Sequence, residues 1–153
     1  MARQFIVRSL TTPSVDKAFA VVRSADFGLT LDQWRDYARG LIKSDTTTSG
    51  GLIVENRAGT IQGLCSYRTE SSLGGATICS VDYLVVLDLI DEATVAAALL
   101  TVLEDMARRW GSEALRVDLP HGTRTTEELL QRLSKNGHQI ERIRLLKVLH
   151  RAG

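Results

Sequence analysis

Two residues of this chain, Asp82 and His121, are of types that act as general bases, and both fall beside expected strands. Asp82 lies in the apolar run from Ala76 to Ile90, two positions before Leu84. In a strand these two side chains would share one face. His121 follows the β-rich run that ends at Leu119, so it would lie just past the end of a strand. The alternative interpretations are a hydrogen-bonded strand aspartate and a loop histidine.

The stretch from Ala76 to Leu119 contains the elements that would position these residues. It reads as an apolar strand, a long amphipathic helix and a second β-rich strand. Arg108 and Arg109 suit the negative end of the helix, and Gly111 provides a stop. The simplest structure with this order is a right-handed βαβ unit with two parallel strands. Ligands of such units bind beyond the strand ends, at the start of the crossover helix, which here lies between residues 87 and 98.

The residues before this unit predict a strand, two short amphipathic helices and an antiparallel meander. Phe5 begins the first strand, and Thr12 is expected to cap the first helix. Thr30 and Gln33 form a capping box for the second helix. The polar run from Lys43 to Gly51 predicts a mobile loop. The strands expected next are Leu52–Val54, Ile61–Arg68 and the long apolar run.

The residues after Leu119 predict one more helix and one more strand. Thr125 and Glu128 form a second capping box, and Gly137 ends the helix. The segment from Gln139 to His150 is rich in Ile, Leu and Val and predicts a final strand. The expected order is β-α-α-β-β-β-α-β-α-β in a single domain of residues 1–153. This is an α+β fold with a central mixed sheet and helices on both faces.

The composition is that of an ordinary globular protein, with 44% hydrophobic and 24% charged residues among 153. A net charge of +1 and the absence of an aromatic-basic ladder argue against nucleic acid as a partner. No segment approaches the roughly 20 apolar residues of a membrane span, and we expect a cytoplasmic protein with no membrane partner. Cys65 and Cys79 lack further ligands spaced for zinc, so we expect buried reduced thiols and no metal.

The order and lengths of these elements resemble the plan of the GNAT superfamily of acyl-CoA-dependent N-acyltransferases. The resemblance covers most of the chain and implies a GNAT-like central mixed sheet. Lys135-Asn136-Gly137-His138 resembles the segment where many members carry a lysine, leucine, glycine and phenylalanine. The residues similar to the family's central helix and the strand after it are Ala98-Leu99-Leu100, Leu103-Glu104, Ala107, Gly111 and Leu115-x-Val117.

The family motif that carries chemistry lies just upstream, and this chain departs from it. In the family, Leu-x-Val-x-Pro is followed by Arg or Gln, two residues, Gly, one residue, and Gly or Ala. The glycines of that motif let backbone amides approach the pyrophosphate of coenzyme A. Here Asp88 replaces the proline, Asp91 replaces Arg or Gln, and Thr94 replaces the first glycine. The positions that the resemblance implies for cofactor binding are Leu84, Val86, Asp91, Thr94, Val95 and Ala96.

Asp91 is a strong N-cap residue, and its carboxylate would bond the same amides as a phosphate and repel it. Thr94 adds a β-carbon where close approach of a ligand needs none. Three interpretations follow: a structural cap replacing an anion that no longer binds, a shifted or weakened cofactor site, and an ordinary site.

The resemblance implies a transferase that takes acetyl-CoA or another acyl-CoA and acylates a small-molecule or peptide amine, with Asp82 or His121 as the base. The family's tyrosine acid corresponds to Leu133, and we expect Tyr67 and Tyr83 to be core or edge aromatics. The alternative is a catalytically inactive GNAT-like binding or regulatory module. Only one strand fits after Gly137, where most relatives have two, so either the sheet stops early or a homodimer partner completes its edge.

Overall fold

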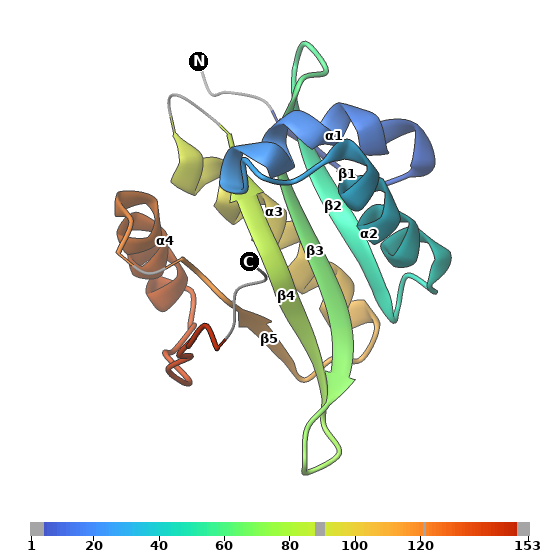
Figure 1. The fold of residues 1–153 in the computed structure, drawn as a ribbon. Helices are drawn as coiled ribbons and strands as arrows, with labels where there is room; N and C mark the ends of the chain where they lie inside the picture. The colour runs from blue at the N-terminus through green and yellow to red at the C-terminus, as the bar shows by residue number, and fades with distance from the viewer. Residues whose placement is uncertain (1–4, 88–90, 121, 150–153) are drawn as a thin grey trace.

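The structure is a computed structural model that describes residues 5–87, 91–120 and 122–149. Five strands form one sheet in chain order, with β1 to β4 antiparallel and β5 parallel to β4 (Figure 1). The strands are β1 (Phe5–Ser9), β2 (Ser49–Asn56), β3 (Ile61–Ser71), β4 (Thr77–Val86) and β5 (Ala114–Val117). The helices are α1 (Thr12–Ala25), α2 (Leu31–Lys43), α3 (Glu92–Arg109) and α4 (Arg124–Lys135).

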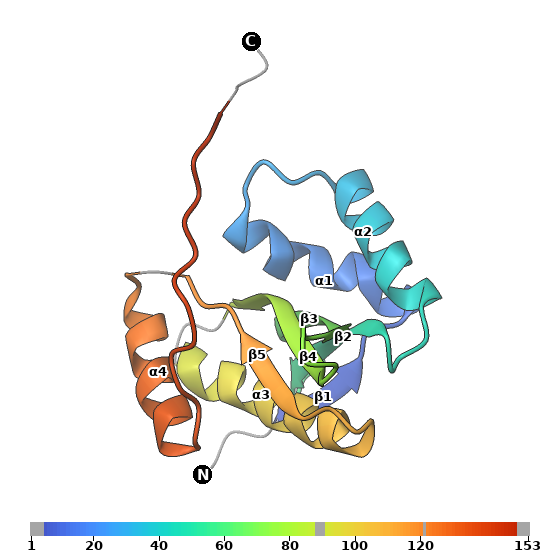
Figure 2. The ribbon, with the colours of Figure 1, turned by 90° about the horizontal axis from the view of Figure 1, so that it is seen from below.

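Helices cover both faces of the sheet, as the apolar patterns predict. Figure 2 shows α1 and α2 on one face, and α3 with α4 on the other. Two apolar layers result, one that includes Leu99 of α3 and one that includes Trp34 of α2. Trp34 is buried, and its indole Nε1 donates a 2.7 Å hydrogen bond to the carbonyl oxygen of Val15, which joins α2 to α1. The predicted α+β architecture with a mixed sheet is confirmed.

Threonines cap α1, α2 and α4, but two of the predicted caps are displaced. Thr30 and Gln33 form the predicted capping box of α2. The N-cap of α1 is Thr11 rather than Thr12. The N-cap of α4 is Thr123, so the predicted capping box at Thr125 is wrong. The hydroxyl of Thr125 instead donates to a carboxylate at the start of α3. Neighbouring threonines have equal capping ability, and the path of the preceding chain decides between them.

The predicted final strand is wrong for its described part, residues 139–149, which pair with no strand. His150 lies outside the described residues. Figure 2 shows this segment passing the β5 edge of the sheet, from the side of α4 toward the side of α1 and α2, rather than running along β5 as a strand. Strand-forming composition is not sufficient, because a strand also needs a partner edge. The expected loop from Lys43 to Gly51 is shorter than predicted, because β2 already pairs with β3 from Ser49 onward.

Gly63 of β3 lies against side chains of β2 and α3, and its replacement by alanine is expected to destabilise the fold. An added β-carbon would lie 2.9 Å from Val54 Cγ1, 3.2 Å from Val95 and 3.3 Å from Leu99. We expect Gly63→Ala to lower the free energy of unfolding by about 1–3 kcal/mol in urea denaturation. Gly40→Ala on α2 is the control, because nothing lies within 4 Å and helix propensity favours alanine there. Equal stability of the two variants would contradict this prediction.

Candidate active site

The strand β4 contains a β-bulge at the residue predicted to be a base. The β3–β4 register pairs Ser66 with Tyr83 but Tyr67 with Val81, so Asp82 is an additional residue on β4. A bulge of this kind changes the alternation of side chains between the two faces of a sheet. Such bulges are frequent beside active sites, because they redirect a side chain.

The bulge places Asp82 and Tyr83 on the same face of the sheet, toward α1 and α2. Tyr83 contacts a tyrosine ring of α2, and Asp82 pairs with Arg68 on that face. Val81 and Leu84 both pack in the apolar layer of α3. The prediction that Asp82 shares a face with Leu84 is therefore wrong, because a bulge breaks the period of two and leaves no clear trace in the sequence.

The parallel strands β4 and β5 separate immediately after this point. Their pairing covers only Ile78–Val81 of β4, while β4 continues to Val86 and β5 ends at Val117. Within the described ranges, no strand therefore pairs with the β5 side of residues 82–86. This opening leaves backbone N–H and C=O groups for an extended ligand to pair with.

The N-terminus of α3 follows β4 and is capped by its own side chains, as the residue type of Asp91 predicts. The carboxylate of Asp91 accepts a 3.1 Å hydrogen bond from the backbone N–H of Thr94. The hydroxyl of Thr94 donates to the same carboxylate. Arg132 of α4 lies 3.9 Å from it. A carboxylate thus occupies part of the positive helix end where an anionic ligand would bind.

The other residues of the expected cofactor motif have their side chains in the core. Val95 and Ala96 are buried under the sheet, and Leu84 and Val86 are half-buried against the same layer. Any contact of Val95 or Ala96 with a ligand would therefore use their backbone groups. The structure brings the four residues together at one end of the sheet, beside the opening between β4 and β5.

A second helix begins at the same place. The hydroxyl of Thr125 in the first turn of α4 donates a 2.6 Å hydrogen bond to Glu92 at the start of α3. The N-termini of α3 and α4 are therefore adjacent, and their dipoles present positive potential to one region. Asp91 and Glu92 of α3 and Glu127 of α4 carry negative charge at these helix starts.

The face that carries Asp82 is polar and includes a residue that sequence reasoning missed. Asp82 accepts hydrogen bonds of 3.0 and 3.1 Å from Nε of Arg68. Tyr37 of α2 lies 2.9 Å from the hydroxyl of the buried Ser66 and packs edge-on against Tyr83. Burial raises the pKa of the Tyr37 phenol, so it keeps its proton at neutral pH. Tyr37 lies three residues after Trp34, and this helical spacing was the only sign in the sequence that Tyr37 could face the sheet.

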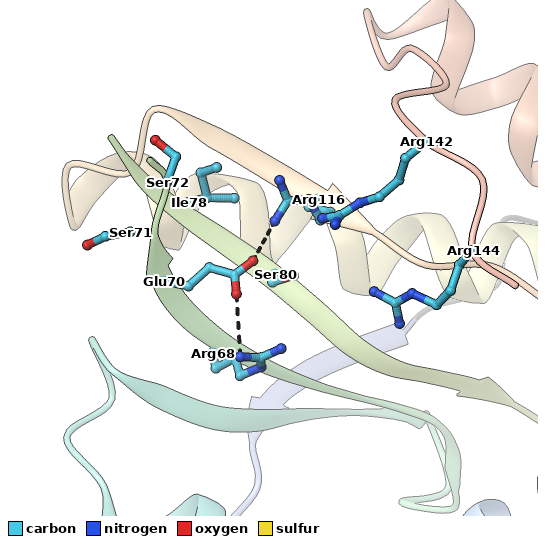
Figure 3. Close-up of a pocket in the computed structure, with 9 residues that line it drawn as sticks. All are labelled: Arg68, Glu70, Ser71, Ser72, Ile78, Ser80, Arg116, Arg142 and Arg144. Atoms are coloured by element: carbon cyan, nitrogen blue, oxygen red, sulfur yellow. Dashed lines mark hydrogen bonds and ion pairs between the residues drawn. The ribbon is translucent and has the colours of Figure 1, made fainter. Parts of the chain in front are cut away.

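A polar cavity of about 240 Å³ lies on this face, beside the paired ends of β4 and β5 (Figure 3). Glu70 lies between Arg68 and Arg116 and pairs with both. Arg142 and Arg144 reach the cavity from the C-terminal segment. Guanidinium and carboxylate groups line it together, and such a lining suits a polar ligand rather than an apolar one.

The remaining predicted residues fall in different places. His121 lies outside the described residues. Leu133 is buried on α4, and Tyr67 is a core residue whose hydroxyl donates to the Thr46 carbonyl oxygen. Tyr83 is 58% exposed, as an edge aromatic would be.

Cys65 and Cys79 are free and buried, as predicted. Burial raises the pKa of the Cys65 thiol to about 12 and that of the Cys79 thiol to about 11. In the part of the chain that the structure describes, no group of three or more His, Cys, Asp or Glu residues could hold a metal ion. None of the helices described is both long and apolar enough to cross a membrane.

No protein-family model and no curated protein sequence matches the chain. Solved structures do match over nearly its whole length. Aminoglycoside N-acetyltransferase AAC(6')-Iy in complex with CoA has a TM-score of 0.75 at 12% identity, covering 99% of this chain and 98% of that one. Glucosamine-6-phosphate N-acetyltransferase from Arabidopsis thaliana has a TM-score of 0.76 at 15% identity, with coverages of 96% and 99%. A GNAT family acetyltransferase from Staphylococcus aureus has 0.71 at 15%, with coverages of 95% and 98%.

Proposed function

We propose that this chain, whose fold is that of the GNAT acetyltransferases, transfers an acyl group from acetyl-CoA or another acyl-CoA to a small-molecule or peptide amine. The observation that carries the proposal is the opening between β4 and β5, which exposes the backbone of residues 82–86 beside the start of α3. The amides of a pantetheine chain can pair with such an edge. The similar fold of an N-acetyltransferase solved with CoA supports this assignment.

In the proposed reaction, the amine nitrogen attacks the thioester carbonyl carbon, and Asp82 takes the amine proton directly or through a water. The carbon–sulfur bond then breaks, and coenzyme A leaves as a thiolate that takes up a proton. Backbone N–H groups stabilise the oxyanion formed during the attack. Leu133 cannot donate the proton that the thiolate takes up. The phenols that lie on the same face as Asp82, and could donate it, are those of Tyr37 and Tyr83. His121 is the second candidate base.

The capped start of α3 favours a second function, that of a GNAT-like binding or regulatory module without transfer. The Asp91 carboxylate already accepts the hydrogen bond of the Thr94 amide. A pyrophosphate arriving there would lose that donor and face a fixed negative charge. The Asp91 cap does not cover the unpaired edge of β4 at residues 82–86. Our first proposal is therefore still acyl transfer, with a weakened affinity for acyl-CoA.

Titration with acetyl-CoA, followed by an assay of thiol release across a panel of amines, separates the two functions. We expect saturable binding in the micromolar range and amine-dependent release of free CoA. The protein's own thiols should not contribute to the signal, because both cysteines are buried. A flat calorimetric titration, without a thermal shift at millimolar acetyl-CoA, would overturn acyl transfer and favour the module.

A further inference from the structure

The polar cavity of Figure 3 has a floor made by one row of residues across three strands. Ser80 of β4 pairs with Arg68 of β3 on one side and with Arg116 of β5 on the other. The neighbours of Ser80 along β4, Cys79 and Val81, pack in the apolar layer of α3, so this row faces the opposite side of the sheet. A short serine side chain between two long arginines leaves a hollow there.

The C-terminal segment closes one side of this cavity with two more arginines. Arg142 and Arg144 alternate along the segment, and Figure 3 shows both reaching toward the cavity. Glu141 holds the segment in place, because its carboxylate accepts hydrogen bonds of 2.9 Å from Nε and Nη2 of Arg116. Arg144 lies 2.8 Å from the carboxylate of Asp118, just past β5. The lining is therefore held in position before a ligand arrives, which lowers the entropic cost of binding.

Positive charge exceeds negative charge in the lining. Four guanidinium groups line the cavity with one carboxylate, that of Glu70. Glu70 is already engaged, because its carboxylate lies 2.5 Å from Arg116 and 3.4 Å from Arg68. The carboxylates that pair with the arginines from outside the lining are Asp82, Asp118 and Glu141. A ligand in the cavity therefore meets mainly guanidinium groups.

The two arginines of the C-terminal segment have donors that a ligand can use. A guanidinium carries five N–H donors. Arg144 reaches Asp118 through Nη1, and Nε of Arg142 lies 3.7 Å from Glu141, which is longer than a hydrogen bond. Converging guanidinium groups bind the oxygens of phosphates and carboxylates, often two at a time. The cavity therefore suits an anionic group.

The cavity adjoins the proposed base. Asp82 follows Ser80 by two positions on β4, and both face the same side of the sheet. Arg68 joins the two, because it lines the cavity and donates hydrogen bonds from Nε to Asp82. Two residues of a strand span roughly 7 Å. One small molecule can therefore place an amine at Asp82 and an anionic group among the arginines.

We propose that this cavity binds the anionic group of the acceptor, so that the amine acylated carries a phosphate or a carboxylate roughly 7 Å from its nitrogen. The inference rests on the proposed function for the fate of the amine, whereas the anion site itself depends only on the arginines. Asp82 attracts the ammonium form of such an acceptor and the guanidinium groups attract its other end, so the charges orient it.

Calorimetric titration without acyl-CoA tests the anion site. The probes are two pairs that differ in the anionic group: 3-aminopropyl phosphate with 3-aminopropanol, and 4-aminobutyrate with butylamine. We expect the anionic member of at least one pair to bind about tenfold more tightly than its neutral partner, and high salt to weaken this preference. The pair with the larger preference identifies the anion as phosphate or carboxylate. Equal affinity within both pairs, or no saturable binding at millimolar probe, would overturn the proposal.

Arg142→Gln combined with Arg144→Gln removes two guanidinium groups and leaves the sheet intact. Their side chains are 47% and 66% exposed, so the variant should fold. We expect the preference for the anionic probe to fall about tenfold. The matched control is Arg39→Gln combined with Arg108→Gln, which removes the same charge from exposed residues of α2 and α3. The control should keep the preference, and an equal loss there would reduce the effect to net charge and overturn the site.

An assay of acylation by acetyl-CoA, with the same four probes, separates this inference from the proposed function. Preferential acylation of the anionic member of a pair, lost in the Arg142 and Arg144 variant, supports both. Binding that depends on the anion, without acylation of any probe, supports the anion site and counts against acyl transfer. Equal acylation of both members of each pair would support acyl transfer and overturn the inference.

Discussion

Replacing Asp91 by asparagine is expected to tighten the binding of acetyl-CoA about tenfold. Asparagine is as good an N-cap as aspartate, so the hydrogen bond from the Thr94 amide should be kept. What changes is the charge. A carboxylate about 6 Å from a phosphate costs roughly 1.4 kcal/mol at an effective dielectric constant of about 40, which corresponds to that factor of ten. Arg132, 3.9 Å from Asp91, would also lose its ion pair and become free to meet a phosphate.

Calorimetry measures the affinity, and thermal unfolding checks that the helix remains capped. Loss of the charge–dipole interaction should cost at most about 1 kcal/mol of stability. Asp32→Asn in the first turn of α2 is the matched control, because it removes the same charge at another helix start. Adding Thr94→Gly to Asp91→Asn should strengthen binding further, since it removes the β-carbon at the point of approach. Unchanged affinity in both variants would mean that the pyrophosphate does not bind at the start of α3.

The cap at Asp91 was predictable because it depends on the residue type and its immediate neighbours. The same is true of the capping box of α2 and of the apolar stripes, whose periods identify helices and strands without reference to the rest of the chain. These local signals are sufficient for the element order from β1 to α4 and for the mixed sheet with two covered faces.

The features that needed the structure depend on residues far apart in the sequence. The bulge at Asp82 is a mismatch between β3 and β4, and the run Val-Asp-Tyr-Leu-Val is compatible with either register. Tyr37 joins the site only because its hydroxyl reaches that of Ser66 on β3, 29 residues away in the sequence. Gln139 to His150 has strand composition, but its described part, residues 139–149, pairs with no strand, because strand formation also depends on contacts with a partner edge elsewhere in the fold. The polar face of the candidate site could therefore not be predicted from the sequence, whereas the start of α3 could.

Asp82→Asn should lower kcat for amine acylation by about 10²–10⁴-fold and leave the affinity for acetyl-CoA nearly unchanged. The amide of asparagine cannot take the amine proton, while β4 and its backbone edge stay in place. Asp16→Asn is the matched control, because Asp16 also pairs side-on with an arginine, Arg35, but lies on α1 away from the opening. The control should keep full activity.

The pH profile separates a base from a mere partner of Arg68. If Asp82 deprotonates the amine, the rate of the Asp82→Asn variant should rise about tenfold with each unit of increasing pH, up to the pKa of the amine. The reason is that the fraction of amine already deprotonated in solution rises by that factor. If Asp82 only holds Arg68, then Arg68→Met should reproduce the loss, and neither variant should recover with pH. The proton transfer is assigned to the Asp82 carboxylate if two results are found together. The rate of Asp82→Asn recovers with rising pH, and Arg68→Met retains most of its activity. Equal, pH-independent losses in the two variants would assign Asp82 to structure, and the search for the base would pass to His121.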